Sequence, residues 1–142
     1  MRIFLDANIL FSAARSDGAM RRLLALLRAG GHELWIDDYV LEEARRNLAV
    51  KEPAGLAGLQ ILLPPLHTGA LRAPDPVLFA SLPLPEKDKP VLAAAIHHRC
   101  AVVITGDRTH FGPLYGKTIA GVTVHSPQSA AVTLLTATTR KA

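Results

Sequence analysis

Cysteine is almost absent from this chain of 142 residues, which contains Cys100 and no other. A single cysteine excludes an internal disulfide framework and suits a reducing compartment. The chain also lacks any run of roughly 18 uncharged apolar residues, the length needed to cross a bilayer. Asp6 interrupts the apolar core that a signal peptide would need. The sequence therefore predicts a cytoplasmic protein without a membrane span.

Several signatures of catalysis and nucleotide binding are missing as well. The chain has neither a G-x-x-x-x-G-K-[ST] loop nor a G-x-G-x-x-G turn, and it has no G-x-S-x-G elbow. Its six histidines show no metal-binding spacing. A phosphoryl-accepting domain with Asp6 as nucleophile is disfavoured, because Asn8 stands where a D-x-D pair would have its second acid.

The bulk composition is that of one globular domain over residues 1–142. Hydrophobic residues make up 49% of the chain, which is enough for a core at this length. The net charge is +4, from 16 basic and 12 acidic residues. Ordinary solubilising charge explains that value, but a basic surface around an acidic pocket also suits a polyanionic substrate.

Strand and helix patterns alternate along the chain. Apolar runs predict strands over 2–5, 33–36, 101–104 and 121–125. Helical periodicity predicts helices over 8–14, 19–29, 39–48, 53–63 and 88–99, with a short helix from Pro127 and a frayed tail from about Thr136. The proline-rich stretch 64–85 allows short strands at 71–73 and 77–80. This alternation predicts a three-layer α/β/α sandwich with a mostly parallel central sheet.

Four acids stand where such a fold would bring them together. Asp6 and Asp107 each follow an apolar strand, Asp88 begins a helix, and Glu43 lies on the helix of 39–48. Carboxyl ends of parallel strands meet at one edge of a sheet, where ligands bind. Hard divalent cations prefer carboxylate oxygens. We therefore predict that all four acids are catalytic ligands of Mg²⁺ or Mn²⁺, supported by the polar side chains of Asn8, Ser12 and Thr105.

Each acid also has a simpler interpretation. Asp6, Asp88 and Asp107 could cap the helices that follow them. Glu43 could pair with Arg46 on a solvated helix face, and Glu42 would replace it as ligand if the helix register were shifted by one. Local capping is an equally good explanation for Ser12 and Thr105. The joint pattern of the acids is harder to explain in this way.

The order of these motifs resembles that of the PIN-domain family. The matching segments are Leu5-Asp6-Ala7-Asn8, Val40-Leu41-Glu42-Glu43-Ala44, Asp88 leading into Val91-Leu92-Ala93-Ala94-Ala95, and Val103-Ile104-Thr105-Gly106-Asp107 before His110-Phe111. The resemblance covers nearly the whole chain and assigns the acidic roles to the same four residues. Many family members have a further acid where this chain has His110, so the resemblance leaves a ligand for a second metal ion in doubt.

The resemblance implies a metal-dependent endoribonuclease that hydrolyses RNA phosphodiester bonds. Many small prokaryotic PIN proteins are VapC-type toxins held inactive by a cognate antitoxin, so an antitoxin partner and a homodimer are further expectations. The alternative is a catalytically inactive PIN fold that binds RNA or a partner. In either case, basic side chains near the site are candidates for RNA contacts: Arg15, Arg45, Arg46 and Arg108, with His110 as a phosphate contact.

Overall fold

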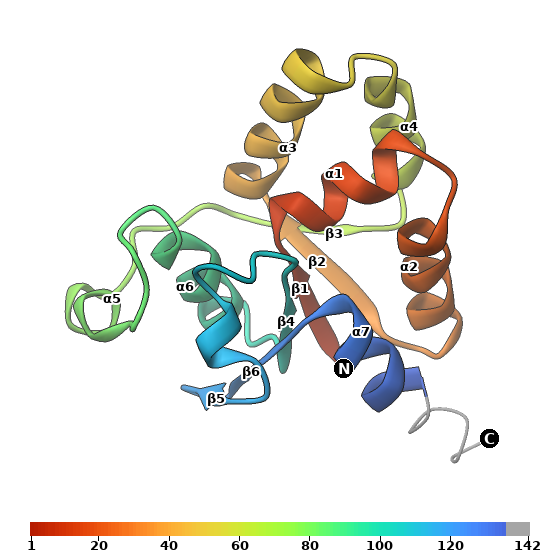
Figure 1. Ribbon diagram of the computed structural model, residues 1–142. Helices are drawn as coiled ribbons and strands as arrows, with labels where there is room; N and C mark the ends of the chain where they lie inside the picture. The colour runs from red at the N-terminus through yellow and green to blue at the C-terminus, as the bar shows by residue number, and fades with distance from the viewer. Residues whose placement is uncertain (136–142) are drawn as a thin grey trace.

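A mostly parallel sheet forms the centre of the protein, whose computed structural model describes residues 1–135 (Figure 1). Within these residues the sheet has six strands in the order β3-β2-β1-β4-β6-β5. The strands are β1 (Arg2–Leu5), β2 (Glu33–Asp37), β3 (His67–Gly69), β4 (Val102–Ile104), β5 (Thr118–Ile119) and β6 (Val122–His125). All neighbours pair in parallel except β5, which runs antiparallel to β6.

The strand order reverses beside β1. The chain moves outward from β1 to β2 and β3, then returns to the other side of β1 as β4. Strands β1 and β4 are hydrogen-bonded neighbours, with Leu5 opposite Ile104. In open sheets of this kind, a ligand binds beyond the carboxyl ends of the strands at the point of reversal. The topology therefore places Asp6 and the segment after Ile104 at the expected ligand site.

Helices cover both faces of the sheet. The helices α1 to α4 pack against one another on one face, whereas α5 and α6 lie on the other, with α6 against β4 and β6 (Figure 1). Their bounds are α1 (Ala7–Arg15), α2 (Ala19–Ala29), α3 (Asp38–Lys51), α4 (Gly55–Leu62), α5 (Pro76–Ser81), α6 (Lys89–His97) and α7 (Pro127–Ala130), with single turns η1 (Gly112–Leu114) and η2 (Ala131–Leu135). The predicted three-layer α/β/α sandwich is confirmed.

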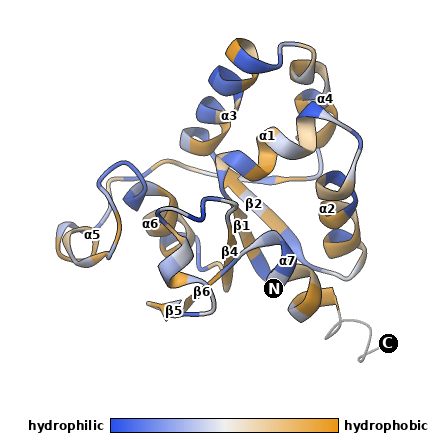
Figure 2. Cartoon of the chain, viewed as in Figure 1, coloured by the Kyte–Doolittle hydropathy of each residue, from blue (hydrophilic) through white to orange (hydrophobic). Residues whose placement is uncertain are grey.

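The core follows from the apolar faces of these elements. Strands β1 and β4 are buried over Ile3–Leu5 and throughout Val102–Ile104, as expected for central parallel strands. Hydrophilic and hydrophobic residues occupy different sides of α2 and α3, so each of these helices has one face toward the core (Figure 2). Among the described helices, none has the length and hydrophobicity to cross a membrane.

The proline-rich stretch 64–85 is where the strand predictions are wrong. Residues 71–73 form no strand, and 77–80 belong to the helix α5. Asp75 accepts a hydrogen bond from the backbone N–H of Val77 at 2.9 Å, and Pro76 stands at the start of the helix, where proline is favoured. Two short edge strands, β3 and β5, were not predicted. The tail expected from about Thr136 lies outside the described residues.

Close contact between α1 and α4 depends on a glycine. A Cβ atom at Gly58 would overlap the backbone oxygen of Ala14 and lie 3.1 Å from its carbonyl carbon. Alanine gains up to about 1 kcal/mol of helix propensity over glycine, but overpacking a core contact costs about 1–3 kcal/mol. We expect Gly58→Ala to lower the free energy of unfolding by roughly 1–2 kcal/mol in urea titrations.

The matched control for this prediction is Gly112→Ala. A Cβ there would have ordinary contact, 4.0 Å from the Cβ atom of Arg108. Its free energy of unfolding should stay within about 0.5 kcal/mol of the parent, as for most substitutions without a clash. A Gly58→Ala protein at least as stable as the parent would show that α1 and α4 can separate without loss.

Candidate active site

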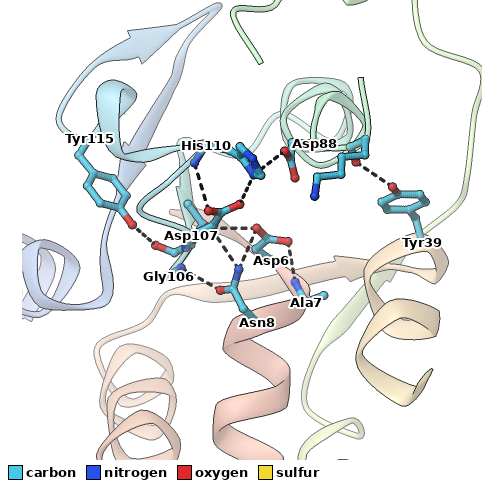
Figure 3. A network of polar contacts seen from close by, with 11 residues as sticks. Asp6, Ala7, Asn8, Tyr39, Asp88, Gly106, Asp107, His110 and Tyr115 are labelled. Atoms are coloured by element: carbon cyan, nitrogen blue, oxygen red, sulfur yellow. Dashed lines mark hydrogen bonds and ion pairs between the residues drawn. The ribbon is translucent and has the colours of Figure 1, made fainter. Parts of the chain in front are cut away.

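Asp6 is the first residue after β1 and joins the ends of β1 and β4. Its backbone N–H donates to the carbonyl oxygen of Ile104 at 3.1 Å, which continues the strand pairing. Its Oδ1 accepts the N–H of Ala7 at 2.7 Å and so caps α1. Its Oδ2 accepts the Thr105 hydroxyl at 2.8 Å and the Asn8 amide at 3.2 Å (Figure 3). One oxygen of Asp6 therefore caps α1 while the other faces Thr105 and Asn8, so capping does not exclude a role in the site.

Burial dominates the electrostatics of this carboxylate. Asp6 is 5% exposed, and burial raises the pKa of its carboxyl from 3.8 to about 6. The hydrogen bonds from Thr105 and Ala7 act in the opposite direction, whereas the charges of Glu43 and Asp88 raise the pKa further. A buried carboxylate repelled by two neighbouring acids is a group that a cation would stabilise.

Thr105 and Asn8 hold the turn after β4 against Asp6. Thr105 is fully buried and accepts the N–H of Asp107 on its hydroxyl oxygen at 3.2 Å. The side-chain oxygen of Asn8 accepts the N–H of Gly106 at 2.8 Å. Both side chains therefore orient carboxylates or their backbone. Their role as supports of metal ligands stays a prediction.

Asp88 and Asp107 face each other across the ring of His110 (Figure 3). The His110 Nδ1 atom lies 2.9 Å from Asp107 Oδ2 and 3.1 Å from Asp88 Oδ2. Burial raises the pKa of the Asp88 carboxyl, His110 lowers it, and Asp107 raises it. Asp88 is at the N-terminus of α6 but its side chain accepts no capping hydrogen bond. Asp88 is thus the N-cap residue of α6 without a side-chain capping bond, and its alternative role beside the helix dipole stays a prediction.

The acids line one pocket of about 350 Å³. Glu43 reaches it from α3, the helix in which Asp37 accepts the N–H of Val40 as the N-cap. Glu42 is on the exposed side of α3, where it pairs with Arg45 at 3.8 Å. The lining residues come from four separated parts of the chain: Asp6, Asn8, Tyr39, Glu43, Asn47, Lys87, Asp88, Val91, Gly106 and Asp107.

Not every predicted residue lies in this pocket. Ser12 and Arg15 are farther along α1 and do not line it. The Arg15 guanidinium lies over the Phe11 ring, 6.0 Å from the ring centre. Arg45 and Arg46 are exposed on α3, and Arg108 lines a neighbouring hollow that shares Gly106 with the site. Their contacts with RNA stay a prediction.

Three polar side chains of this lining were missed from the sequence: Tyr39, Asn47 and Lys87. Tyr39 and Asn47 stand four residues before and after Glu43 on α3, so helical spacing could have found them. The Tyr39 hydroxyl donates to the carbonyl oxygen of Lys87 at 2.9 Å, which ties α3 to the segment before α6. Lys87 adds a positive charge beside Asp88. Its position directly before that acid could have identified it as a residue of the pocket.

A larger hollow of about 450 Å³ lies on the other side of Tyr39. It is lined mainly by apolar side chains and by the loop 70–74. Its carboxylate, Asp37, is engaged in capping α3. The acidic pocket is therefore the better candidate for phosphate chemistry, although it is the smaller of the two.

The donor set of the acidic pocket fits a hard divalent cation. Carboxylates predominate, and within residues 1–135 no described side chain donates a hydrogen bond to the buried Oδ2 atom of Asp88. An unsatisfied buried oxygen that faces other acids is a natural ligand for Mg²⁺ or Mn²⁺. One ligand atom each of Asp88, Asp107 and His110 lie within 4.8 Å of one another.

Comparisons with known proteins agree with this geometry. A family model described as PIN domain matches residues 2–109. A solved structure of VapBC2 from Rickettsia felis, bound to a DNA fragment from its promoter, contains a similar chain. The two chains are 19% identical with a TM-score of 0.63, and the match covers 89% of this chain and 98% of the other. At this identity the likeness shows the fold. A search of curated proteins found no match.

Proposed function

Since the chain belongs to the PIN-domain family, we propose that it is a metal-dependent endoribonuclease that hydrolyses phosphodiester bonds in RNA. The observation that carries the proposal is the convergence of Asp6, Glu43, Asp88 and Asp107 on one pocket. They come from the end of β1, from α3, from the residue before α6 and from the turn after β4. Separate elements have to be folded together to produce this cluster, and helix capping alone does not account for it.

The four carboxylates would hold Mg²⁺ or Mn²⁺. When bound, such an ion supplies positive charge that stabilises the oxygens of the reacting phosphate. Thr105 and Asn8 fix the Asp6 carboxylate by donating hydrogen bonds to its Oδ2 atom. Glu43 is partly exposed at the pocket, where it would either complete the ligand set or orient the attacking water and accept its proton. Asn47, one turn further along α3, is a hydrogen-bond donor for the substrate.

Lys87 and Arg108 are the basic side chains best placed for the RNA backbone. Lys87 lines the acidic pocket, and Arg108 follows Asp107 directly and lines the adjoining hollow. Positive charges on either side of an acidic pocket would hold a phosphate chain across it. Arg46, exposed on α3, would extend this contact. Arg15, beyond the pocket on α1, would act through long-range attraction.

An antitoxin partner is part of the same proposal. The similar chain from Rickettsia felis belongs to a VapBC complex, which supports a role as the toxin of a toxin–antitoxin module. A ribonuclease of this kind would act on cytoplasmic RNA. A homodimer stays a prediction that the molecular mass in solution would test.

Cleavage of a mixed-sequence structured RNA by the purified protein tests the function. We expect cleavage with Mg²⁺ or Mn²⁺, none with chelator, and a loss of at least about a hundredfold in Glu43→Gln, which is the usual size of a general-base contribution. Glu42→Gln is the matched control, because Glu42 is 63% exposed and paired with Arg45. Its activity should equal that of the parent.

Two outcomes would contradict the assignment. Equal activity of Glu43→Gln and the parent would remove Glu43 from the mechanism. RNA binding in chelator, without cleavage under either metal, would favour the inactive RNA-binding module instead. A preparation purified with its antitoxin would need that partner removed first, since bound antitoxin would block the pocket.

A further inference from the structure

The imidazole of His110 is part of the carboxylate cluster (Figure 3). Its Nδ1 atom is 2.9 Å from Asp107 Oδ2 and 3.1 Å from Asp88 Oδ2. The side chains of His110, Asp88 and Asp107 are 29%, 16% and 25% exposed. The group is therefore shielded by protein on most sides and open to solvent on one, as a site that exchanges an ion has to be.

The backbone holds this ring in place. The N–H of His110 donates to Asp107 Oδ1 at 3.1 Å, so the same carboxylate contacts both the backbone and the ring of His110. The next residue, Phe111, is fully buried and its N–H donates to the carbonyl oxygen of Asp107 at 3.0 Å. Rigid support of this kind is typical of ligands that have to keep a fixed geometry.

Asp88 presents its buried Oδ2 atom to the ring without a hydrogen bond of good geometry. No other described residue donates to that oxygen, so a buried acceptor is left without a hydrogen bond. In octahedral coordination at about 2.1 Å, neighbouring ligand atoms lie about 3.0 Å apart. The two separations from His110 Nδ1 are close to this value, so an ion could replace the direct contacts with little rearrangement.

We propose that His110 is a metal ligand that shares one divalent cation with Asp88 and Asp107. The inference rests on the proposed nuclease function and adds which divalent cation the site prefers. Imidazole favours ions such as Co²⁺, whereas carboxylate and water favour Mg²⁺. The cluster therefore binds a first-row transition ion more tightly than Mg²⁺.

A purely structural role for His110 makes the opposite prediction. If the ring were a charged partner that neutralises Asp88 and Asp107, it would compete with any metal ion. Its removal would then leave the charges of Asp88 and Asp107 without a neutralising partner and tighten metal binding. His110→Ala thus separates the two roles by the sign of the change in affinity.

The test is calorimetric titration of the metal-free protein with Co²⁺ and with Mg²⁺ at pH 8, in the absence of RNA. We expect His110→Ala to weaken Co²⁺ binding at least about tenfold, the smallest loss typical of changes around a metal site, and Mg²⁺ binding less. His110→Asp should recover Mg²⁺ affinity but not the preference for Co²⁺. His97→Ala, which removes an exposed histidine on α6, controls for adventitious Co²⁺ binding.

Unchanged or tighter Co²⁺ binding in His110→Ala would overturn the proposal. If that variant does not fold, by its thermal unfolding curve, His110→Asp decides the question through its ratio of Co²⁺ to Mg²⁺ affinity. Because no RNA is present, the result is separate from the nuclease test. If the parent cleaves RNA but His110→Asp keeps the parent's ratio of Co²⁺ to Mg²⁺ affinity, this inference alone is contradicted.

Discussion

Replacing Asp6 with asparagine is expected to lower the rate of RNA cleavage at least about a thousandfold. The Asp6 side chain lines the pocket, and its negative charge contributes to the raised pKa of the Tyr39 and Tyr115 hydroxyls. Loss of one carboxylate from a metal site removes several kcal/mol of transition-state stabilisation, and about 4 kcal/mol corresponds to a thousandfold in rate. Single-turnover cleavage under saturating metal measures the effect.

Asp75→Asn is the matched control for this substitution. Asp75 also caps a helix, since it accepts the N–H of Val77 at 2.9 Å, but it begins α5 and is exposed. Asparagine is as good an N-cap as aspartate, so both variants should fold, which circular dichroism would check. Parent-like cleavage by Asp6→Asn would refute the assignment of the pocket. Equal loss in both variants would mean that the effect is not specific to the site.

The second large effect concerns the stability of the metal-free protein. Burial raises the pKa of Asp6 from 3.8 to about 6. The folded state therefore holds this proton more tightly than the unfolded state does. Between these two values the folded state binds more protons, so the contribution of Asp6 to the free energy of unfolding falls as the pH rises. A shift of about two pKa units corresponds to about 3 kcal/mol in total.

The difference between Asp6→Asn and the parent isolates this contribution. Other groups titrate in the same range: burial raises the pKa of Asp37 and lowers the pKa of His98 and His125. These groups are common to both proteins and largely cancel in the difference. With chelator present, the stability of Asp6→Asn relative to the parent should rise by about 2–3 kcal/mol from about pH 3.5 to about pH 7 in urea titrations.

Metal ions should offset this gain in the stability of Asp6→Asn relative to the parent at neutral pH. Excess Mg²⁺ binds the folded parent and raises its free energy of unfolding, whereas Asp6→Asn should respond weakly. If the stability of Asp6→Asn relative to the parent does not change with pH, the Asp6 carboxyl has the same pKa in the folded and unfolded states. Burial would then not raise the pKa of Asp6.

Local pattern was enough to predict most elements of this fold. Apolar runs located β1, β2, β4 and β6, and helical periodicity located α1 to α4 and α6 to within a few residues. Their alternation implied parallel pairing, because a helix between two strands returns the chain to the end of the sheet from which the first strand began. Asp6 and Asp107 could then be assigned to the same edge. The motif order also pointed to the family whose model matches residues 2–109.

Long-range packing decided the remaining features. β3 is a strand because its backbone pairs with β2 and the His67 ring stacks on Trp35, at 5.1 Å between ring centres. The helix at residues 77–80 is an exception, because the Asp75 cap that begins it is a local contact that the sequence could have indicated. Three features require elements distant in sequence to meet. They are the strand order beside β1, the inward side of α3 that selects Glu43 over Glu42, and the placement of His110 between two acids. Periodicity describes each element alone, so these juxtapositions are visible only once the chain has folded.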